Sequence, residues 1–223
     1  MNASASDAPS SLSRLTSLEL CARRPKLEQS APALWQVLKA CVFLDKALKS
    51  ELAVLFHASA RAPVCGAGCG ACCCQPIPLS LAEAVAIRKF LRLTALPPPT
   101  PDPKGDPNHC PFMENGHCTI YPIRPFACRR FMVFNHCCAP GEDPTVTRPE
   151  DVLRPSRKIL FETLCLTLPV YQALGLPVPD RVTLDFFIRH TSLTQAFPWR
   201  EGEDPEPESL DGVETGTPGA QRE

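Results

Sequence analysis

Hydrophobic residues recur every three or four positions from residue 32 to about residue 60. These positions are Leu34, Val37, Leu38, Cys41, Leu44, Leu48, Leu52 and Leu55. Such spacing places the side chains on one face of an α-helix, and Pro32 suits a first helical turn, in which its missing N–H is no loss. We therefore expect the longest helix of the chain here, with Cys41 as a small core residue on its apolar face.

A second amphipathic helix is expected from about Leu81 to Leu93. Ser80 and Glu83 have the spacing of a capping box, in which each side chain accepts a hydrogen bond from the backbone N–H of the other residue. The prolines between Pro97 and Pro107 then predict an extended, non-helical connector.

The pattern of hydrophobic positions is weaker after residue 150. It predicts a third helix from Ser156 to Leu168, which Pro169 bends or ends, and it leaves residues 182–191 open between a short helix and a strand. The absence of alternating strands and helices argues against a Rossmann fold and a β/α barrel. The predicted fold class is mainly α, a small single domain with irregular, metal-stabilised cysteine loops.

Both ends of the chain differ in composition from its middle. Residues 1 to about 30 are rich in Ser and Ala, which predicts a poorly ordered segment apart from a short turn at Leu15–Leu20. Residues 31–198 are expected to form the helical domain, with a cysteine-cluster module at about 60–138. Residues 199–223 are expected to be a disordered acidic tail: the last 23 residues carry a net charge of −7, which leaves +6 on residues 1–200. The alternative is a tail that folds back on the basic body.

The overall composition restricts the compartment and the partners. The net charge of −1 and the sequence pI of about 6.5 argue against a nucleic-acid binder that works by neutralising phosphates. Neither a secretory signal nor an apolar run of transmembrane length is visible. A cytoplasmic location without membrane insertion is therefore expected, and in that reducing compartment a dense cysteine cluster favours metal binding over disulfides.

Ten of the 13 cysteines lie between Cys65 and Cys138. The first group consists of Cys65, Cys69, Cys72, Cys73 and Cys74, separated by glycines that permit close backbone approach to an ion. Adjacent cysteine side chains diverge along the chain, so Cys72, Cys73 and Cys74 are not expected to serve one mononuclear site together.

The second group contains Cys110, Cys118 and Cys128. Asn115-Gly116 is a strong turn signal, so Cys110 and Cys118 are expected on the two arms of a tight reversal. Metal bound between this group and the first would connect two loops that the proline-rich middle cannot hold by core packing. Cys137 and Cys138 form a third and weaker group.

The two main groups together resemble the YkgJ-like cysteine-cluster family, which is described as a zinc- or iron-chelating domain of the CxxxCxxCC type. The resemblance covers roughly residues 60–135 and rests on the linked spacing of the cysteines together with Pro111-Phe112, Gly116, Ile120-Tyr121 and Arg124-Pro125. It implies a metal-ligand set of Cys65, Cys69, Cys72, Cys73, Cys110, Cys118 and Cys128. Cys74 and the long proline connector depart from the family pattern.

The sequence also predicts roles for several residues next to these cysteines. Arg124 and Arg129 are expected to offset the negative charge of clustered thiolates. Tyr121 and Phe126 are expected to pack around the site. The three histidines next to cysteines, His109, His117 and His136, are expected to be solvated more often than they ligate, and the isolated Cys21 and Cys165 are expected to lie away from the site.

Three functions are compatible with this pattern. The first is a metal-binding protein that holds an iron–sulfur cluster or zinc, with iron–sulfur favoured because a glycine-rich C-x3-C-x2-C loop can wrap a cubane and because the second half lacks a C-x2-C zinc knuckle. The second is an enzyme related to the cysteine-cluster lysine N-methylases, which would bind S-adenosylmethionine. The third is a metal-handling or assembly factor that passes metal to a protein partner, since vicinal cysteines suit the exchange of soft metals.

Overall fold

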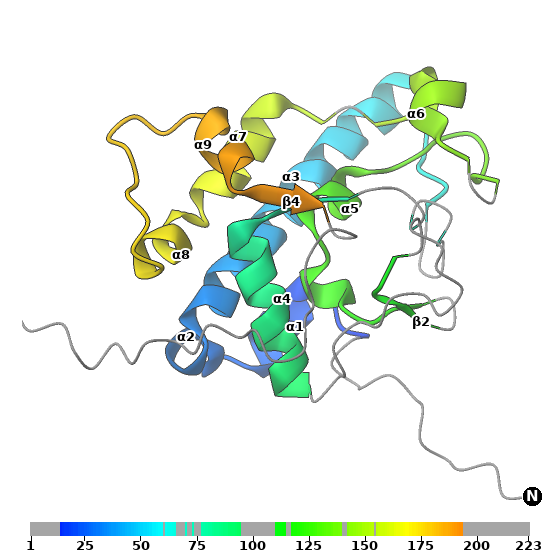
Figure 1. Cartoon of the computed structure of the whole chain (residues 1–223). Helices are drawn as coiled ribbons and strands as arrows, with labels where there is room; N and C mark the ends of the chain where they lie inside the picture. The colour runs from blue at the N-terminus through cyan, green and yellow to red at the C-terminus, as the bar shows by residue number, and fades with distance from the viewer. Residues whose placement is uncertain are drawn as a thin grey trace, which may run out of the picture.

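The computed structural model of this chain describes residues 14–59, 61–65, 70, 73, 77–94, 110–114, 117–139, 142–153 and 155–193. Within them the fold is mainly helical, and the strands form two short antiparallel pairs (Figure 1). The proline connector, the acidic tail, Cys69, Cys72, Cys74 and His109 lie outside the described residues.

Helix α3, Pro32–Ser59, is the scaffold of the molecule. Its buried face contacts α1 (Ser17–Arg23), α2 (Leu27–Ser30), α4 (Leu81–Thr94), α5 (Phe126–Arg130), α7 (Arg157–Cys165) and α8 (Leu168–Ala173). Leu34, Leu38, Cys41 and Leu44 are completely buried there. The predicted long helix, its start at Pro32 and the core position of Cys41 are thus confirmed.

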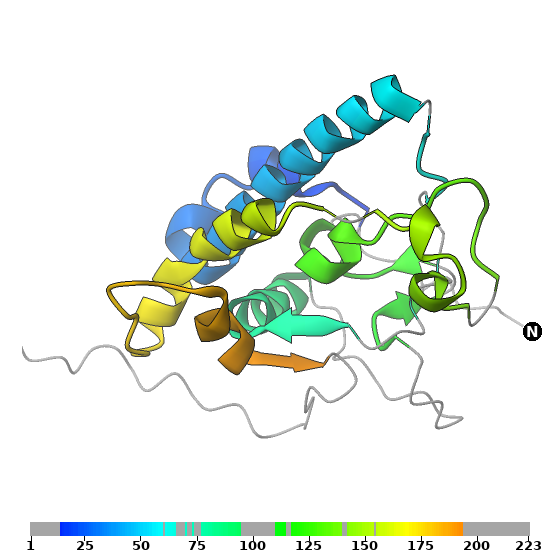
Figure 2. The ribbon, with the colours of Figure 1, turned by 90° about the horizontal axis from the view of Figure 1, so that it is seen from above.

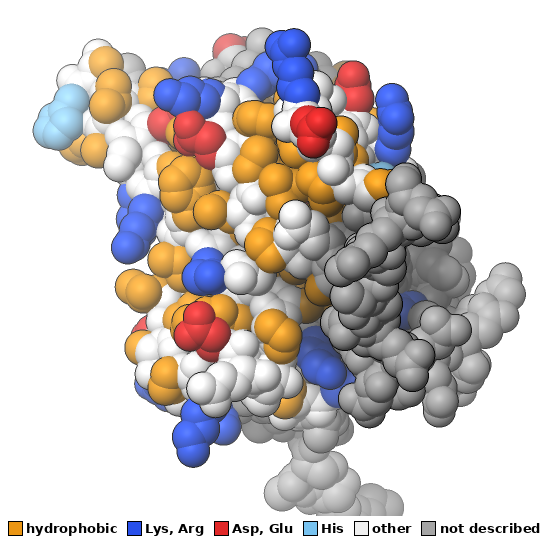
Figure 3. Space-filling model, turned by 90° about the vertical axis from the view of Figure 1, so that its left-hand side faces the viewer, with side chains coloured by type: hydrophobic (Ala, Val, Ile, Leu, Met, Phe, Trp, Pro, Cys, Tyr) orange, Lys and Arg blue, Asp and Glu red, His pale blue; other side chains and the backbone are white. Residues whose placement is uncertain are grey.

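The last turns of α3 extend beyond the elements that pack on it (Figure 2). Val54 and Phe56 are 68% and 52% exposed in this part of the helix, and Figure 3 shows hydrophobic side chains on the corner of the molecule that projects at the upper left. No helix in the described part of the chain is both long enough and apolar enough to cross a membrane.

The predicted second helix is confirmed as α4, and its capping box is formed. Glu83 Oε2 accepts a hydrogen bond from the Ser80 backbone N–H at 2.9 Å and another from the Ser80 hydroxyl. Glu83 Oε1 accepts a third from the backbone N–H of Phe126, at 2.6 Å. A single buried carboxylate therefore caps α4 and also binds the N-terminus of α5, the helix that carries Cys128. Burial raises the pKa of Glu83, and the hydrogen bonds from Ser80 and Phe126 oppose that shift.

Replacing Glu83 by Ala should lower the free energy of unfolding by about 2–3 kcal/mol, because buried donors at Ser80 and Phe126 lose their acceptor. Glu83→Gln keeps one carbonyl acceptor and should be less destabilising. Urea denaturation of both variants measures the difference. Equal stability of Glu83→Ala and the parent protein would contradict this account of the α4–α5 junction.

Residues 155–193 fold as three short helices and a strand. α7 begins at Arg157, with Ser156 as its N-cap, and ends at Cys165. The helix predicted for residues 156–168 is thus divided: α7 ends before Pro169, and Pro169 itself lies in the first turn of α8, Leu168–Ala173. Residues 182–191, left open between two states, are chiefly helical: α9 spans Leu184–Arg189 and passes into β4, Thr191–Leu193.

Strand β4 pairs with β1, Pro78–Ser80, so that Leu79 lies opposite Ser192. This pair connects the C-terminal helices to the start of α4. Tyr171 of α8 packs against the rings of Phe186, Phe187 and His190, with ring centroids 5.1–5.8 Å apart. The aromatic cluster fills the space between α8 and α9.

The expectation of a poorly ordered segment at residues 1 to about 30 is wrong for residues 14–30, which form α1 and α2. Thr16 and Glu19 make a second capping box at the start of α1, with Glu19 Oε2 2.8 Å from the Thr16 backbone nitrogen. Leu20 and Leu27 bury their side chains in the core beside α3. The few apolar residues of this Ser-rich segment are sufficient to hold α1 and α2 in place, because α3 supplies the surface on which they pack.

Candidate metal centre

Cys110 and Cys118 are brought together by a short hairpin. Strands β2, Met113–Glu114, and β3, His117–Cys118, pair with Met113 opposite Cys118. The Cys110 carbonyl accepts a hydrogen bond from the Met113 N–H at 3.1 Å. The predicted placement of Cys110 and Cys118 on the arms of a reversal is confirmed by these flanking strands, while the two turn residues lie outside the described part.

Cys118 lies in a partly buried position that disfavours a bare thiolate. Burial raises its pKa to about 11, and the neighbouring thiol of Cys110 acts in the same direction. The backbone N–H of Ile120 and the positive charges of Arg124 and Arg129 oppose that shift. A metal cation that binds here must therefore displace a proton, so that binding strengthens as pH rises.

In metal-free protein, alkylation of Cys118 should be at least tenfold slower at pH 8 than alkylation of the exposed Cys137, and it should accelerate as pH approaches 11. The reason is that the thiolate is the nucleophile and a thiol with pKa about 11 contributes almost none of it at pH 8. Mass spectrometry of iodoacetamide-treated protein at several pH values gives both rates. A Cys118 rate that is independent of pH would contradict the raised pKa.

Cys65 is anchored to the segment that follows α5. Its sulfur accepts a hydrogen bond from the Val133 N–H at 3.2 Å, and the N–H of Val64 bonds to the Val133 carbonyl at 2.9 Å. Cys128 lies within α5, and Cys65 and Cys128 line the same cavity, of about 410 Å³. Two predicted ligands from segments far apart in the sequence thus border one space.

Gly70 joins the first cysteine group to the hairpin of the second. A Cβ atom built on Gly70 would lie 3.3 Å from Cε and 3.7 Å from Sδ of Met113, the residue opposite Cys118. The Gly70 carbonyl in turn accepts the N–H of Cys73 at 2.9 Å. The two cysteine segments are therefore in contact, and a small residue at position 70 permits the close approach.

Arg129 is buried and connects the cysteine-bearing segment to α3. Its Nη1 contacts both carboxylate oxygens of Asp45, at 3.1 and 2.8 Å. Its Nε and Nη2 donate to the carbonyls of Arg124 and Pro122, at 3.0 and 2.6 Å. The sequence predicted a charge-balancing role for Arg129. It did not predict the ion pair with Asp45, because no local pattern relates two positions so distant in the chain.

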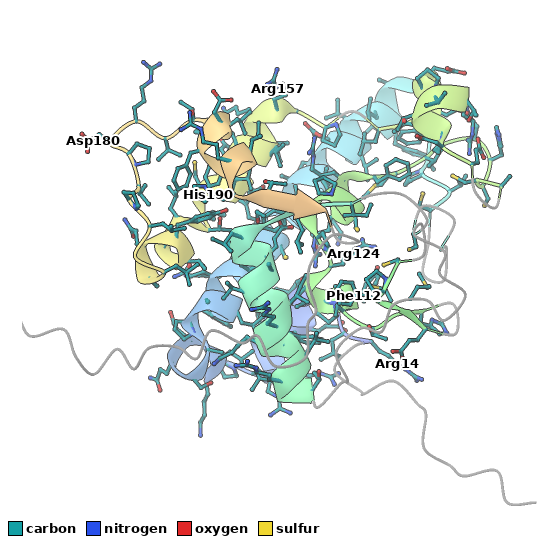
Figure 4. The ribbon with its side chains drawn as sticks, in the orientation of Figure 1. Arg14, Phe112, Arg124, Arg157, Asp180 and His190 are labelled. Atoms are coloured by element: carbon teal, nitrogen blue, oxygen red, sulfur yellow. The ribbon has the colours of Figure 1, made fainter. Side chains whose placement is uncertain are left out.

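Arg124 lies on the same side of the molecule as Phe112 and the hairpin (Figure 4). Its guanidinium carbon is 4.5 Å from the centre of the Tyr121 ring. Its Nε atom is buried and has no hydrogen-bond partner among the described residues. Tyr121 lines the cavity beside Cys65 and Cys128, whereas Phe126 is buried in the hydrophobic core.

The remaining cysteines and histidines are placed as follows. Cys21 and Cys165 pack against the hydrophobic core and do not line the cavity. His117 and His136 are exposed. Cys138 accepts a hydrogen bond from Arg148 Nη2 at 3.4 Å. Arg148 was not singled out from the sequence, since its contact with Cys138 depends on the turn that α6, Pro144–Thr147, introduces between them.

Five of the seven predicted ligands, Cys65, Cys73, Cys110, Cys118 and Cys128, belong to the described residues. Considering the described side chains by themselves, no three Cys, His, Asp or Glu residues are gathered closely enough to hold a metal ion. The ligand set, which also includes Cys69 and Cys72, therefore remains a prediction.

Residues 64–150 match the model of the CxxCxxCC family, described as a "putative zinc- or iron-chelating domain". The match covers 87 of the 223 residues, and this segment is similar to the CxxCxxCC family. The CxxCxxCC domain contains all seven predicted ligands, and it is the same cysteine-cluster family that the sequence resembles. No curated protein and no solved structure matches the chain.

The donor chemistry of the CxxCxxCC domain fits such a metal. Thiolates are the ligands that zinc and iron–sulfur clusters prefer, and the guanidinium groups of Arg124 and Arg129 act on Cys118 with the sign that stabilises a thiolate. The family match and the donor set together support metal chelation as the property of this domain.

Proposed function

We propose that this protein holds a thiolate-ligated metal centre in its CxxCxxCC domain, an iron–sulfur cluster in preference to zinc. The ligand set of the proposal is Cys65, Cys69, Cys72, Cys73, Cys110, Cys118 and Cys128. The observation that carries it is the contact of Gly70 with Met113, since it joins the glycine-rich first cysteine group to the hairpin of the second.

The surrounding elements support a fixed centre. Cys118 is fixed by the β2–β3 pair. Cys65 is tied by its hydrogen bond to Val133, and Cys128 lies in α5, whose N-terminus Glu83 binds. Three ligands thus come from regular or hydrogen-bonded backbone, and such support orients ligands before metal arrives.

The choice of iron–sulfur over zinc follows from the spacing and number of thiols. A glycine-rich C-x3-C-x2-C loop can surround a cubane, the second half of the set lacks the C-x2-C knuckle of a structural zinc site, and the thiols beyond four leave ligands for a second centre. When bound, such a cluster supplies either one-electron transfer or structural cross-linking of its loops. The polypeptide contributes the ligating sulfurs and the positive charges of Arg124 and Arg129.

Anaerobic purification followed by iron, zinc and acid-labile sulfide analysis tests the proposal. We expect iron and sulfide in equal amounts, a brown colour, and loss of both in Cys118→Ser. Cys21→Ser is the matched control, because Cys21 packs on the core away from the cavity, and it should keep the full content. A colourless protein that contains stoichiometric zinc would overturn the preference for iron–sulfur, and protein free of both metals would overturn the metal centre.

A further inference from the structure

The cavity that Cys65 and Cys128 border extends from the cysteine segments to the surface of α3. Its walls come from the start of α1, the middle of α3, the 3-10 turn Tyr121–Ile123 and α5. Its volume of about 410 Å³ lies in the range of sites that bind small molecules, about 300–1,000 Å³. Nothing in the proposed metal ligation requires a space of this size.

Positive charge dominates the lining. Lys46 and Lys49 on α3 and Arg124 all border the cavity, and neither lysine forms an ion pair with another described residue. The one carboxylate among the described lining residues, Asp45, is bound to Arg129 at 2.8 Å. Apart from the Arg129–Asp45 pair, three positively charged side chains line the described part of the cavity: Lys46, Lys49 and Arg124.

The rest of the lining is largely apolar. Val42, Leu48 and Leu52 of α3 face Phe131 and Met132 across the space. Residues 45, 48, 49 and 52 recur at the three- and four-residue spacing that places side chains on one helical face, so α3 presents Leu48 and Leu52 next to Lys49. A ligand that fits both features carries a negative head group on an apolar body.

We propose that this cavity binds a small organic anion, a carboxylate or phosphate with an apolar tail, whose head group lies among Lys46, Lys49 and Arg124. The inference rests on the proposed function in one respect: the anion adjoins the metal centre because Cys65 and Cys128 belong to the ligand set. Arg124 lines the cavity, and its buried Nε has no hydrogen-bond partner among the described residues.

A competing explanation is that the cations only balance the thiolate charge of the centre. The positive charge of Arg124 lowers the pKa of Cys118. Lys46 and Lys49 border the cavity together with Cys65 and Cys128, so their replacement tests both explanations. The lysines therefore separate the two explanations: if they serve an anion, replacing them weakens anion binding and leaves the metal content unchanged.

Hexanoate and hexyl phosphate are suitable probes, titrated by calorimetry into the protein purified anaerobically with its metal. Acetate lacks the apolar tail and 1-hexanol lacks the charge. We expect saturable binding of at least one of the two long anions, at least tenfold tighter than acetate or hexanol, and the tighter of the two identifies the head group. The double variant Lys46→Gln, Lys49→Gln should weaken that binding at least tenfold. Lys39→Gln, on an exposed position of α3 outside the cavity, is the control and should bind as the parent does.

The outcomes distinguish this inference from the metal centre. Absence of saturable binding by both anions, hexanol binding as tight as hexanoate, or an unchanged affinity in the lysine double variant would overturn the anion site. Parallel loss of metal and anion in that variant would show that the lysines serve the centre and would also overturn it. Iron, zinc and sulfide are measured on the same samples, so metal-loaded protein that binds no anion refutes only the cavity inference. Metal-free protein that binds hexanoate refutes only the metal centre.

Discussion

Replacing Cys118 by Ser should remove the metal and loosen residues 61–138 while leaving α3 folded. The segments on either side of α4, residues 61–76 and 95–118, have many prolines and glycines and few large apolar side chains, so their order is expected to depend strongly on ligation. Structural thiolate sites supply about 10–16 kcal/mol in zinc-finger peptides, which is comparable with the entire stability of a small domain. Limited proteolysis of metal-loaded and metal-free protein measures the effect as the rate of cleavage within residues 61–138, and Cys69→Ser should behave in the same way.

Cys21→Ser is the control for this experiment, since Cys21 packs on the core beside α3 and does not line the cavity. Far-ultraviolet circular dichroism should show that the helical signal of Cys118→Ser is largely retained. Equal protection of residues 61–138 with and without metal would show that ligation does not hold this region together.

Replacing Arg129 by Leu should lower the free energy of unfolding by about 3 kcal/mol. Arg129 is 3% exposed and binds Asp45 and the carbonyls of Arg124 and Pro122. Removing one member of a buried pair costs about 3–5 kcal/mol, and the 35% exposure of the Asp45 side chain places the expected loss at the lower end because water can solvate the remaining carboxylate.

Thermal and urea unfolding under identical metal loading give this value. Arg157→Leu is the matched control, because Arg157 lies exposed at the first position of α7 and its loss should change stability by less than about 0.5 kcal/mol. If Arg129→Leu is as stable as Arg157→Leu, the α3–α5 connection through Asp45 is not important for the fold.

The sequence was sufficient for the features that depend on local chemistry. The apolar stripe around Leu38 and Leu44 predicted α3, and the pair Ser80 and Glu83 predicted the cap of α4, because helix spacing and capping involve residues only three or four positions apart. The cysteine spacing indicated the family because a motif is a pattern of residue types at fixed intervals along the chain and can be recognised without the fold.

Features that depend on distant contacts could not be read from the chain. The third hydrogen bond of Glu83 reaches Phe126, and Lys46 and Lys49 border a cavity with Cys128; no spacing rule relates such positions. Pro169 illustrates a different limit, because proline ends one helix or begins another equally well. The sequence alone did not show that α8 begins at Leu168 and has Pro169 in its first turn.

The order of elements along the chain has a consequence for biosynthesis. Helix α3 ends at Ser59, whereas α7 and α8, which cover part of it, begin at Arg157 and Leu168. A ribosome therefore completes α3 and the whole cysteine module before the last partners of α3 exist. In that interval the nascent chain exposes an apolar helical face beside reduced thiols. If the proposed metal centre forms on the nascent chain, it closes the module before the C-terminal helices dock, and folding yield then depends on the metal available during synthesis.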